Sequence, residues 1–599
     1  MDVLLKNTFN NEAEIYDETT QYLMLNYNDT LDLLVEQIDF GENERFTILD
    51  VGCGTGNLLC KLRNRFPNAI IYGVDFADDM LSVAKGKKIN GVKYFNSDLF
   101  LLEELPLPFF DVITVSFTFH NFHSVDEHLR AMKIINGLLA VNGTLIIADL
   151  IDFNDPFGHK ENQNKLVSLM RNHGLSDAEI LKWLGILKIE DSPLSIQTNT
   201  NLLLQAGFES VKSIVFNDRE CAIFSARKKT DAIHVKSELL CWGIKPNELS
   251  RNIYNSQNPN DITKTGNNGV FLTIDGLDVL VGINNETNRM SPYELFFEKE
   301  HYYLTKRKNK INLIVEPIAF PEWAFHPISN SYMGDRFSNY FVYEGHGYLH
   351  LAYKSCSFAE SEKCKFCSVK RREESEDCSA ELICNALDEV LPLIPENVHF
   401  CLGGGTYLPL KQNVEFFKKI VKHIRNSKRS NPIWIEMIPP SISEIKELID
   451  AGATSFGFNI EIWDENLRKN ICPGKSTIPK SRYLNACKYV VDTLGDDYIG
   501  SCLICGLDTK ENIIKAVDAL LEIGVQPCIL LYKNFDTDLG DYLIPVQYHR
   551  DYYYISKYTA EKALKKNLMF KNSEGCLRCN CCTIMHDLQI QIQNPIINS

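Results

Sequence analysis

The stretch Cys356-Ser-Phe-Ala-Glu-Ser-Glu-Lys-Cys364-Lys-Phe-Cys367 places three thiols close together and ends in a Cys-x-x-Cys pair. Thiolates are the protein ligands of iron–sulfur clusters and of structural zinc. The spacing alone does not separate these uses, because Cys-x-x-Cys is common to both. Zinc would need a fourth protein ligand from elsewhere in the chain, whereas a four-iron cluster held by three thiolates keeps one iron open.

Local features around these cysteines favour the cluster. Phe366 stands beside the last cysteine and offers an apolar shield for one cluster face. The β-like run 348–353 leads into the cysteine loop, and a later short strand ends at Gly403, Gly404 and Gly405. Glycines expose backbone N–H and C=O groups to a ligand that lies close.

Strands and helices alternate along this part of the chain. Repeated βα units predict a parallel sheet with right-handed crossovers, and six such units fit a partial (β/α)6 barrel of the TIM type. Its active groups should lie at the carboxyl ends of the strands. The expected strands after 348–353 are 397–402, 432–438, 452–461, 498–507 and 527–532, and the expected helices are 379–394, 412–427, 441–451, 480–494 and 510–523.

Residues 341–575 therefore resemble the radical S-adenosylmethionine (SAM) superfamily, although seven residues separate the first two cysteines where three are commonest. The resemblance implies that Cys356, Cys364 and Cys367 hold a [4Fe–4S] cluster whose open iron binds SAM. It also implies that the glycine segment holds the methionine amino group, and that polar side chains contact the ribose and the carboxylate. The implied SAM-binding residues are Gly403, Gly404, Gly405, Glu436, Asn459, Glu461 and Arg482.

A second glycine-rich turn, Asp50-Val-Gly52-Cys-Gly54-Thr-Gly56, follows an apolar strand near the amino terminus. Such a turn brings backbone close to a ligand, and the following helix start supplies free N–H groups. The pattern resembles motif I of class I SAM-dependent methyltransferases, and residues 1–227 form the expected domain. The resemblance implies that Asp50, Gly52, Gly54 and Gly56 bind SAM.

Further acids follow at the ends of strand-like segments. Asp75 could accept both ribose hydroxyl hydrogens, Asp98 could accept from the adenine amino group, and Met80 could pack against adenine. Each acid alone is more often a helix cap or a solvated residue, but their joint order favours a binding edge. The segments 69–75, 92–98, 109–117, 143–149 and 221–227 predict a doubly wound, Rossmann-like sheet, which 221–227 closes.

The methyl acceptor leaves a weaker signal. His120 and Asn121 follow the fourth strand, where His120 could act as a general base near neutral pH. The alternative is a loop histidine that is hydrogen-bonded for structure. Residues 1–40 predict two cover helices, and the helical insertion 152–200 is expected to shape acceptor specificity.

The tail, residues 576–599, opens with four thiols in seven positions among polar residues. These fit a second metal site, either an auxiliary iron–sulfur cluster or structural zinc, and redox or substrate thiols are a third reading. Cys502 and Cys505 lie three apart on an apolar strand, so they should point to opposite faces and serve as core thiols. The tail cysteines are Cys576, Cys579, Cys581 and Cys582.

Composition bounds the remaining expectations. A chain of 599 residues with 45% hydrophobic and 23% charged residues should fold into more than one globular domain. A net charge of −16 argues against nucleic acid as the main partner, and no apolar run predicts a membrane span. The start lacks a signal-peptide pattern, so the 19 cysteines indicate a reducing, cytoplasmic location. Residues 228–340 predict a hinge at 228–250 and a small β-rich segment without an assigned function.

Together these patterns predict a bifunctional enzyme with two SAM sites. It would combine methyl transfer with radical hydrogen abstraction on a small molecule or peptide, and would need an electron donor such as flavodoxin or ferredoxin. One alternative is a methyltransferase carrying a zinc-stabilised, acceptor-binding module. Another is a degenerate methyltransferase domain that serves only as a scaffold.

Overall fold

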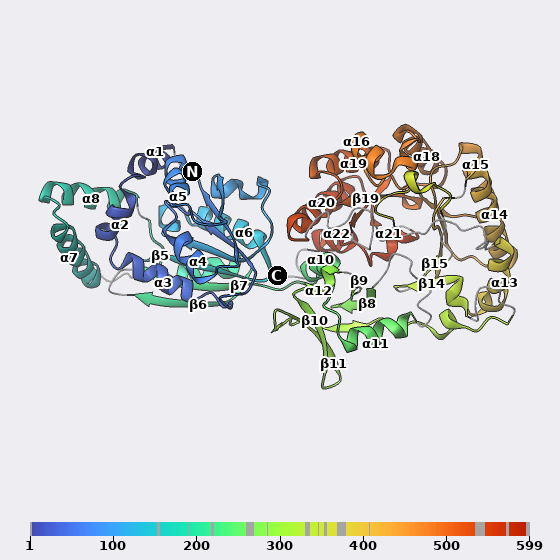
Figure 1. The fold of residues 1–599 in the computed structure, drawn as a ribbon, viewed down its shortest axis with the longest axis horizontal. Helices are drawn as coiled ribbons and strands as arrows, with labels where there is room; N and C mark the ends of the chain where they lie inside the picture. Colours follow the sequence, from blue (N-terminus) through green and yellow to red (C-terminus); the bar gives the residue numbers. More distant parts are fainter. Residues whose placement is uncertain are drawn as a thin grey trace. The chain divides into compact units, whose positions relative to one another are not determined.

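The computed structural model describes residues 3–152, 156–190, 192–216, 221–258, 269–283, 286–329, 336–345, 347–352, 356–367, 379–406, 408–532, 545–570 and 574–594. The chain divides into two compact units, Met1–Thr230 and Asp231–Ser599 (Figure 1). The boundary predicted at residue 227 falls inside the last strand of the first unit.

The first unit is built on a seven-stranded sheet of order β3-β2-β1-β4-β5-β7-β6, in which β7 runs in the direction opposite to the other six strands. The predicted Rossmann-like sheet is confirmed. The segment 221–227 was expected to close the sheet, but it lies between β5 and β6, because its apolar run is buried while β6 is largely exposed. The strands are β1 (Thr47–Val51), β2 (Ile70–Asp75), β3 (Lys93–Asn96), β4 (Phe110–Ser116), β5 (Leu139–Leu150), β6 (Phe208–Phe216) and β7 (Cys221–Lys228).

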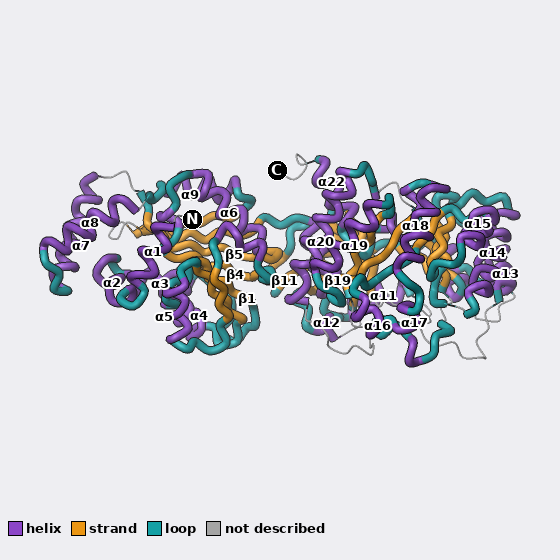
Figure 2. The backbone as a smooth tube through the Cα atoms, turned by 90° about the horizontal axis from the view of Figure 1, so that it is seen from above, coloured by secondary structure: helices purple, strands orange, loops and turns teal. Residues whose placement is uncertain are grey.

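Helices cover both faces of this sheet (Figure 2). Ile48 and Leu49 show why, since neighbouring strand residues point to opposite faces and enter different cores. Three helices, where two were predicted, precede β1. The helices are α1 (Val3–Glu12), α2 (Tyr16–Leu23), α3 (Tyr27–Glu36), α4 (Asn57–Arg65), α5 (Asp78–Gly86), α6 (Val125–Leu138), α7 (Pro156–Asn172), α8 (Asp177–Glu190) and α9 (Ile196–Gln205).

The second unit contains the predicted half-barrel. Six parallel strands, β15 to β20, form its sheet, and β14 joins the edge in antiparallel orientation. The strands are β14 (Phe341–Glu344), β15 (Tyr348–Leu351), β16 (His399–Leu402), β17 (Ile433–Glu436), β18 (Ser455–Gly457), β19 (Ile499–Cys505) and β20 (Gln526–Leu531). The connecting helices are α13 (Ala380–Val390), α14 (Leu410–Asn426), α15 (Ile442–Ala451), α16 (Glu465–Ile471), α17 (Pro473–Ser476), α18 (Lys480–Leu494) and α19 (Lys510–Glu522).

An antiparallel sheet of six strands precedes the barrel, as the β-rich prediction requires. The boundary between the two units, at Thr230 and Asp231, falls inside the segment predicted as a hinge at 228–250, and the buried helix α10 occupies much of the rest of that segment. Its charged residues pair inside the unit: Lys236 with Asp587 at 2.7 Å, and Glu238 with Lys306 at 2.7 Å. The elements are α10 (Ala232–Trp242), α11 (Glu248–Gln257), β8 (Gly269–Ile274), β9 (Leu277–Gly282), α12 (Glu286–Arg289), β10 (Tyr293–Glu298), β11 (His301–Lys306), β12 (Asn309–Lys310) and β13 (Val315–Pro317).

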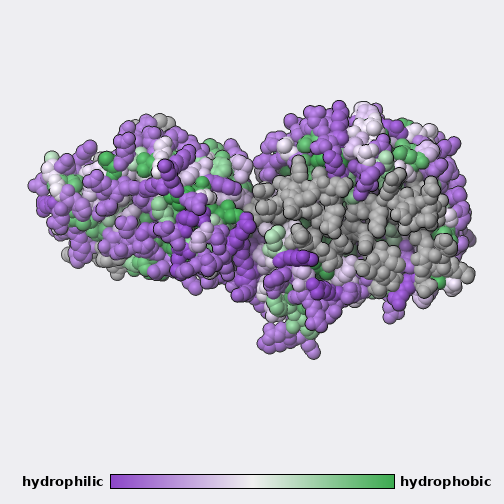
Figure 3. Space-filling model, viewed as in Figure 1, coloured by the Kyte–Doolittle hydropathy of each residue, from purple (hydrophilic) through white to green (hydrophobic). Residues whose placement is uncertain are grey.

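The chain ends with α20 (Pro545–Lys565), α21 (Cys576–Cys579) and α22 (Met585–Gln593). The tail packs into the second unit, where Leu280 N donates to Cys581 O at 2.9 Å. Among the residues that Figure 3 colours by hydropathy, hydrophilic ones dominate and apolar ones are scattered. Among the helices that the structure describes, none is both long and apolar enough to cross a membrane.

Removing Asp587 should destabilise the second unit strongly. Asp587→Ala leaves the fully buried ammonium of Lys236 without its carboxylate, a change that costs about 3–5 kcal/mol in comparable buried pairs. Calorimetric unfolding should show the transition of this unit at a markedly lower temperature. The control Glu294→Ala breaks the exposed pair with Lys245 and should cost at most about 1 kcal/mol. Equal shifts in the two variants would contradict the assignment.

Candidate active sites

The glycine turn after β1 has a backbone that requires glycine. Gly52, Gly54 and Gly56 have φ angles of +71°, +50° and +84°, in the left-handed region that other residues rarely adopt. A Cβ atom at Gly52 would lie 2.3 Å from Oγ1 of Thr118, whereas one at Gly54 would meet open space. The turn therefore presents bare backbone to a neighbouring pocket.

Asp75 at the end of β2 fixes this turn. Its Oδ2 accepts a hydrogen bond from Gly54 N at 2.7 Å, and its Oδ1 accepts from Ala77 N at 2.9 Å. Burial raises the pKa of Asp75, and these backbone donors oppose that rise. The side chain also lines the pocket, so the same carboxylate could accept from a ligand hydroxyl.

The pocket encloses about 810 Å³ of space, part of it open to solvent. The predicted residues Gly52, Gly54, Asp75, Met80 and Asn121 line it. Helices α1, α2 and α3 contribute aromatic side chains that sequence reasoning missed, because nothing in their local pattern marks a contact made across the fold. These side chains are Phe9, Tyr16 and Tyr27.

A cluster around Asp17 attaches α2 to the glycine turn. Asp17 Oδ1 accepts from Thr55 Oγ1 at 2.5 Å and from Asn57 Nδ2 at 2.9 Å, and Oδ2 pairs with Lys87 at 2.6 Å. Burial acts to raise the pKa of Asp17, but these partners outweigh it and lower that pKa. The contacts hold the aromatic wall against the pocket.

Two predicted SAM-binding acids lie off this pocket wall. Asp50 is fully buried, and its Oδ1 accepts from Thr114 Oγ1 at 2.9 Å. Within the described part of the chain its Oδ2 has no hydrogen-bond partner, and burial raises the pKa of Asp50 to about 7. Asp98 accepts from Phe100 N at 2.9 Å and so caps a short helix.

His120 and Asn121 occupy different positions. His120 is buried behind the wall, with Nδ1 2.5 Å from Asp149 Oδ1 and Nε2 3.3 Å from Asn121 Nδ2. Asp149 also accepts from the backbone N–H of Phe119 at 2.6 Å, which fixes the loop after β4. Asn121 reaches the pocket and His120 does not.

The second pocket lies at the carboxyl ends of the barrel strands and encloses about 920 Å³. Two backbone hydrogen bonds hold the cysteine loop here: Ser357 N to Thr406 O at 2.7 Å, and Lys365 N to Ile471 O at 2.8 Å. Most of the implied SAM-binding residues line this pocket together with the three thiols. The lining includes Cys356, Cys364, Cys367, Gly403, Gly404, Gly405, Glu436, Asn459, Glu461 and Lys475.

A polar network crosses this pocket. Asn459 Nδ2 donates to Glu436 Oε1 at 2.9 Å, and its Oδ1 accepts from Cys502 N at 2.9 Å. Glu461 has a φ of +67°, a strained value for a non-glycine residue, and pairs with Lys475 at 2.7 Å. Its Oε2 is buried without a hydrogen-bond partner among the described residues.

The cation of this network was missed by the sequence prediction. Burial acts to lower the pKa of Lys475, but Glu461 and Cys364 outweigh it and keep that pKa well above its usual value. Arg482, the predicted cation, is exposed on α18 and does not line the pocket. The cations that line the pocket are instead Lys475 on α17 and Lys363 in the cysteine loop.

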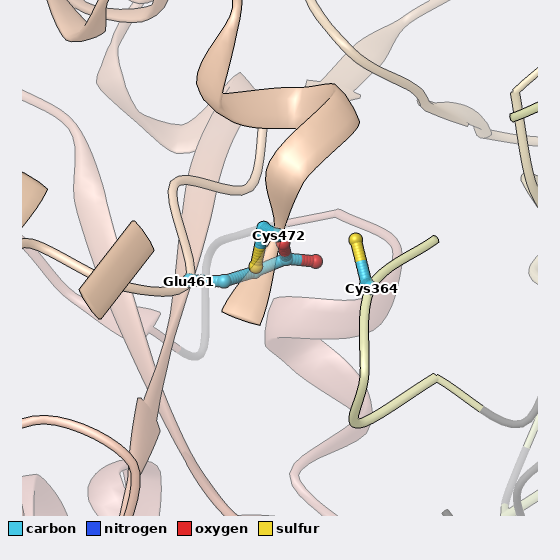
Figure 4. Close-up of side chains that lie close together, drawn as sticks. All are labelled: Cys364, Glu461 and Cys472. Carbon is cyan, nitrogen blue, oxygen red and sulfur yellow. The ribbon is translucent and has the colours of Figure 1, made fainter. Parts of the chain in front are cut away.

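A further thiol lies near Cys364. Figure 4 shows Cys364, Glu461 and Cys472 together, and their ligand atoms lie within 4.8 Å of one another. Cys472 donates a hydrogen bond to Cys364, which lowers the pKa of the Cys364 thiol. Cys472 does not line the pocket, and Lys475 already neutralises Glu461. The sulfur donors that line the pocket are therefore three thiols beside bare glycine backbone, a set that fits an iron–sulfur cluster.

Comparison with known proteins assigns both units. A family profile described as "Methyltransferase domain" matches residues 48–143, and one described as "Radical SAM superfamily" matches residues 354–535. The chain therefore contains a methyltransferase domain and a radical SAM domain. It is a bifunctional enzyme that uses SAM in both domains and a [4Fe–4S] cluster in the second, together with a reductant.

Individual relatives resemble parts of the chain. A carboxy-S-adenosyl-L-methionine synthase from Campylobacter hominis is 27% identical over 225 residues, 36% of this chain and 92% of the relative. A demethylmenaquinone methyltransferase from Thermus thermophilus is 35% identical over 109 residues, 17% of this chain and 46% of the relative. Magnesium protoporphyrin IX methyltransferase from Synechocystis is 16% identical, with a TM-score of 0.28, over 38% of this chain and 99% of that one.

Asp75→Ala should weaken SAM binding in the first unit. It removes the acceptor of Gly54 N and Ala77 N, and hydrogen bonds to a charged group contribute about 1.5–3 kcal/mol each. Titration calorimetry should therefore show a Kd for SAM raised about tenfold or more. The measurement uses a background in which Cys356, Cys364 and Cys367 are alanine, so that only this site is read. An unchanged Kd would contradict the role of Asp75.

Asp50→Asn should change the pH dependence of stability. The folded-state pKa of about 7 exceeds the ordinary 3.8, so the folded wild type binds more protons than the unfolded chain between these values. Wild-type stability therefore falls as pH rises through this window, and the neutral variant escapes the loss. The variant should gain about 2–4 kcal/mol relative to wild type between pH 4 and 7.5, at about 1.4 kcal/mol per pKa unit. If the free energy of unfolding changed with pH in the same way in both proteins, the raised pKa of Asp50 would be contradicted.

Proposed function

We propose that the chain modifies one small molecule or peptide twice, with methyl transfer in the first unit and hydrogen abstraction in the second. The observation that carries this proposal is the presence of two glycine-walled pockets at the carboxyl ends of parallel strands. Among the described residues, one thiol, Cys53, lines the first pocket, whereas three thiols line the second. Both pockets suit SAM as the cosubstrate. The three thiols of the second pocket suit reductive cleavage of SAM, and the first pocket suits methyl transfer. Successive steps on one substrate would explain why both domains share a chain.

In the first unit, the glycine turn and Asp75 would hold the methionine and ribose parts of SAM, and Met80 would pack against adenine. Asn121 reaches the pocket and would contact the methyl acceptor. His120 would act as a positioning residue, because Asp149 holds its ring against Asn121. Methyl transfer then requires the acceptor nucleophile to lie in line with the bond between the methyl carbon and the sulfur of SAM. The main contribution of the protein is to orient the two reactants.

In the second unit, Cys356, Cys364 and Cys367 would hold the cluster. When bound, the cluster supplies the electron that cleaves SAM into methionine and a 5′-deoxyadenosyl radical, which abstracts hydrogen from the substrate. The backbone of Gly403 to Gly405 would bind the amino group of SAM. Lys475 would pair with its carboxylate, in the role first assigned to Arg482.

The partners follow from this chemistry. A small electron-transfer protein such as flavodoxin or ferredoxin would deliver the electron. The thiols require a reducing compartment, which we infer to be the cytoplasm. Cysteines of the tail would take part in holding a second iron–sulfur cluster.

The test is turnover of SAM without substrate. Anaerobically reduced, iron-loaded protein should release 5′-deoxyadenosine, because reductive cleavage does not require the substrate. Lys475→Met should raise the KM for SAM in this assay about tenfold or more, since a charged contact contributes about 1.5–3 kcal/mol. Arg482→Met, which removes an exposed cation off the pocket, should leave the KM unchanged. Absence of 5′-deoxyadenosine, or the reverse order of the two variants, would contradict the proposal.

A further inference from the structure

Thiols other than the three of the cysteine loop gather inside the second unit. One apolar cluster contains thiols from β16, β19, β20 and the tail, packed around Tyr348, Trp434 and Leu577. An adjoining cluster contains three tail thiols, and Cys579 belongs to both. The six cysteines are Cys401, Cys502, Cys528, Cys579, Cys581 and Cys582.

Four of these thiols form two contacting pairs. Cys502 and Cys528 stand opposite each other on neighbouring parallel strands, and their side chains are hydrogen-bonded. Cys579 and Cys581 are hydrogen-bonded in the same way on the tail. Both tail sulfurs crowd Gly345, where an added Cβ would lie 2.7 Å from Sγ of Cys581 and 3.5 Å from Sγ of Cys579.

The fold brings the tail to the strands by specific contacts. A Cβ at Gly500, two residues before Cys502, would lie 2.5 Å from Leu577, which stands two residues before Cys579. Gly575 N donates to His399 Nδ1 at 3.0 Å, at the first residue of β16. These contacts fix the tail against the beginnings of the barrel strands. The radical SAM pocket lies at the other ends of the same strands.

We propose that Cys502, Cys528, Cys579 and Cys581 together hold a second iron–sulfur cluster. Thiolate sets of this kind select soft metals and iron–sulfur clusters, and four cysteines are the usual ligand number for a complete cluster. In this proposal Cys502 is a cluster ligand, whereas the sequence predicted a core thiol. Two strand thiols also replace Cys576 and Cys582 in the ligand set that was expected from the tail alone. The assignment rests on the proposal that the tail takes part in a second cluster.

The test removes the first cluster and counts the iron that remains. In the full chain with Cys356, Cys364 and Cys367 changed to alanine, anaerobic reconstitution with iron and sulfide should leave about two to four irons per chain. Adding Cys502→Ala and Cys528→Ala should reduce that iron at least fivefold, with loss of the visible absorption band. Cys487→Ala, which changes a buried thiol on α18, is the matched control and should leave iron unchanged.

The other outcomes separate the two proposals. If the triple variant binds no iron, or binds zinc instead, the second cluster itself is wrong. If iron survives the Cys502 and Cys528 changes but is lost with Cys576→Ala and Cys582→Ala, the cluster is real and our ligand set is wrong. Cys502→Ser and Cys528→Ser preserve volume and polarity, so iron loss in these variants with unchanged circular dichroism separates lost ligation from misfolding.

Discussion

The chemistry of the second unit depends on how many thiols line the pocket at the carboxyl ends of the barrel strands. Cys356, Cys364 and Cys367 line the pocket, whereas Cys472 contacts Cys364 from outside it. A four-iron cluster held by three thiolates keeps one iron free for SAM. In the proposed site, the bare glycine backbone and the cation of Lys475 would bind SAM only if that iron stays open.

The first unit uses the same edge of a parallel sheet for different chemistry. Its glycine turn is fixed by Asp75, and aromatic side chains line the pocket beside it; Cys53 is the one thiol among the described lining residues. Such a site would suit the binding and orientation of SAM, but a single thiol is too few to hold a cluster. Both pockets lie at the carboxyl edge of a parallel sheet, so sheet geometry does not separate them. We attribute the two reactions of SAM, methyl transfer and reductive cleavage, to the different side chains around each pocket.

Much of this architecture could be predicted from local sequence. Apolar runs ending in glycine or an acid predicted the six barrel strands and the Rossmann-like core, because these signals lie within a few residues. Side-chain direction was not predictable, so Asp50 and Arg482 were placed at sites that they do not line. Contacts made across the fold were missed, such as Tyr16 in the first pocket and the pairing that buries Lys236 in a supposed hinge.

Mössbauer spectroscopy of the first cluster, with and without SAM, tests the open iron most directly. The sample is iron-57 protein in which Cys579 and Cys581 are alanine, so that one cluster is read. We predict that SAM changes the signal of one iron among the four, and that Cys472→Ala leaves this response intact. A spectrum that SAM does not change, or one that responds only after Cys472 is removed, would show a fourth protein ligand and contradict the account.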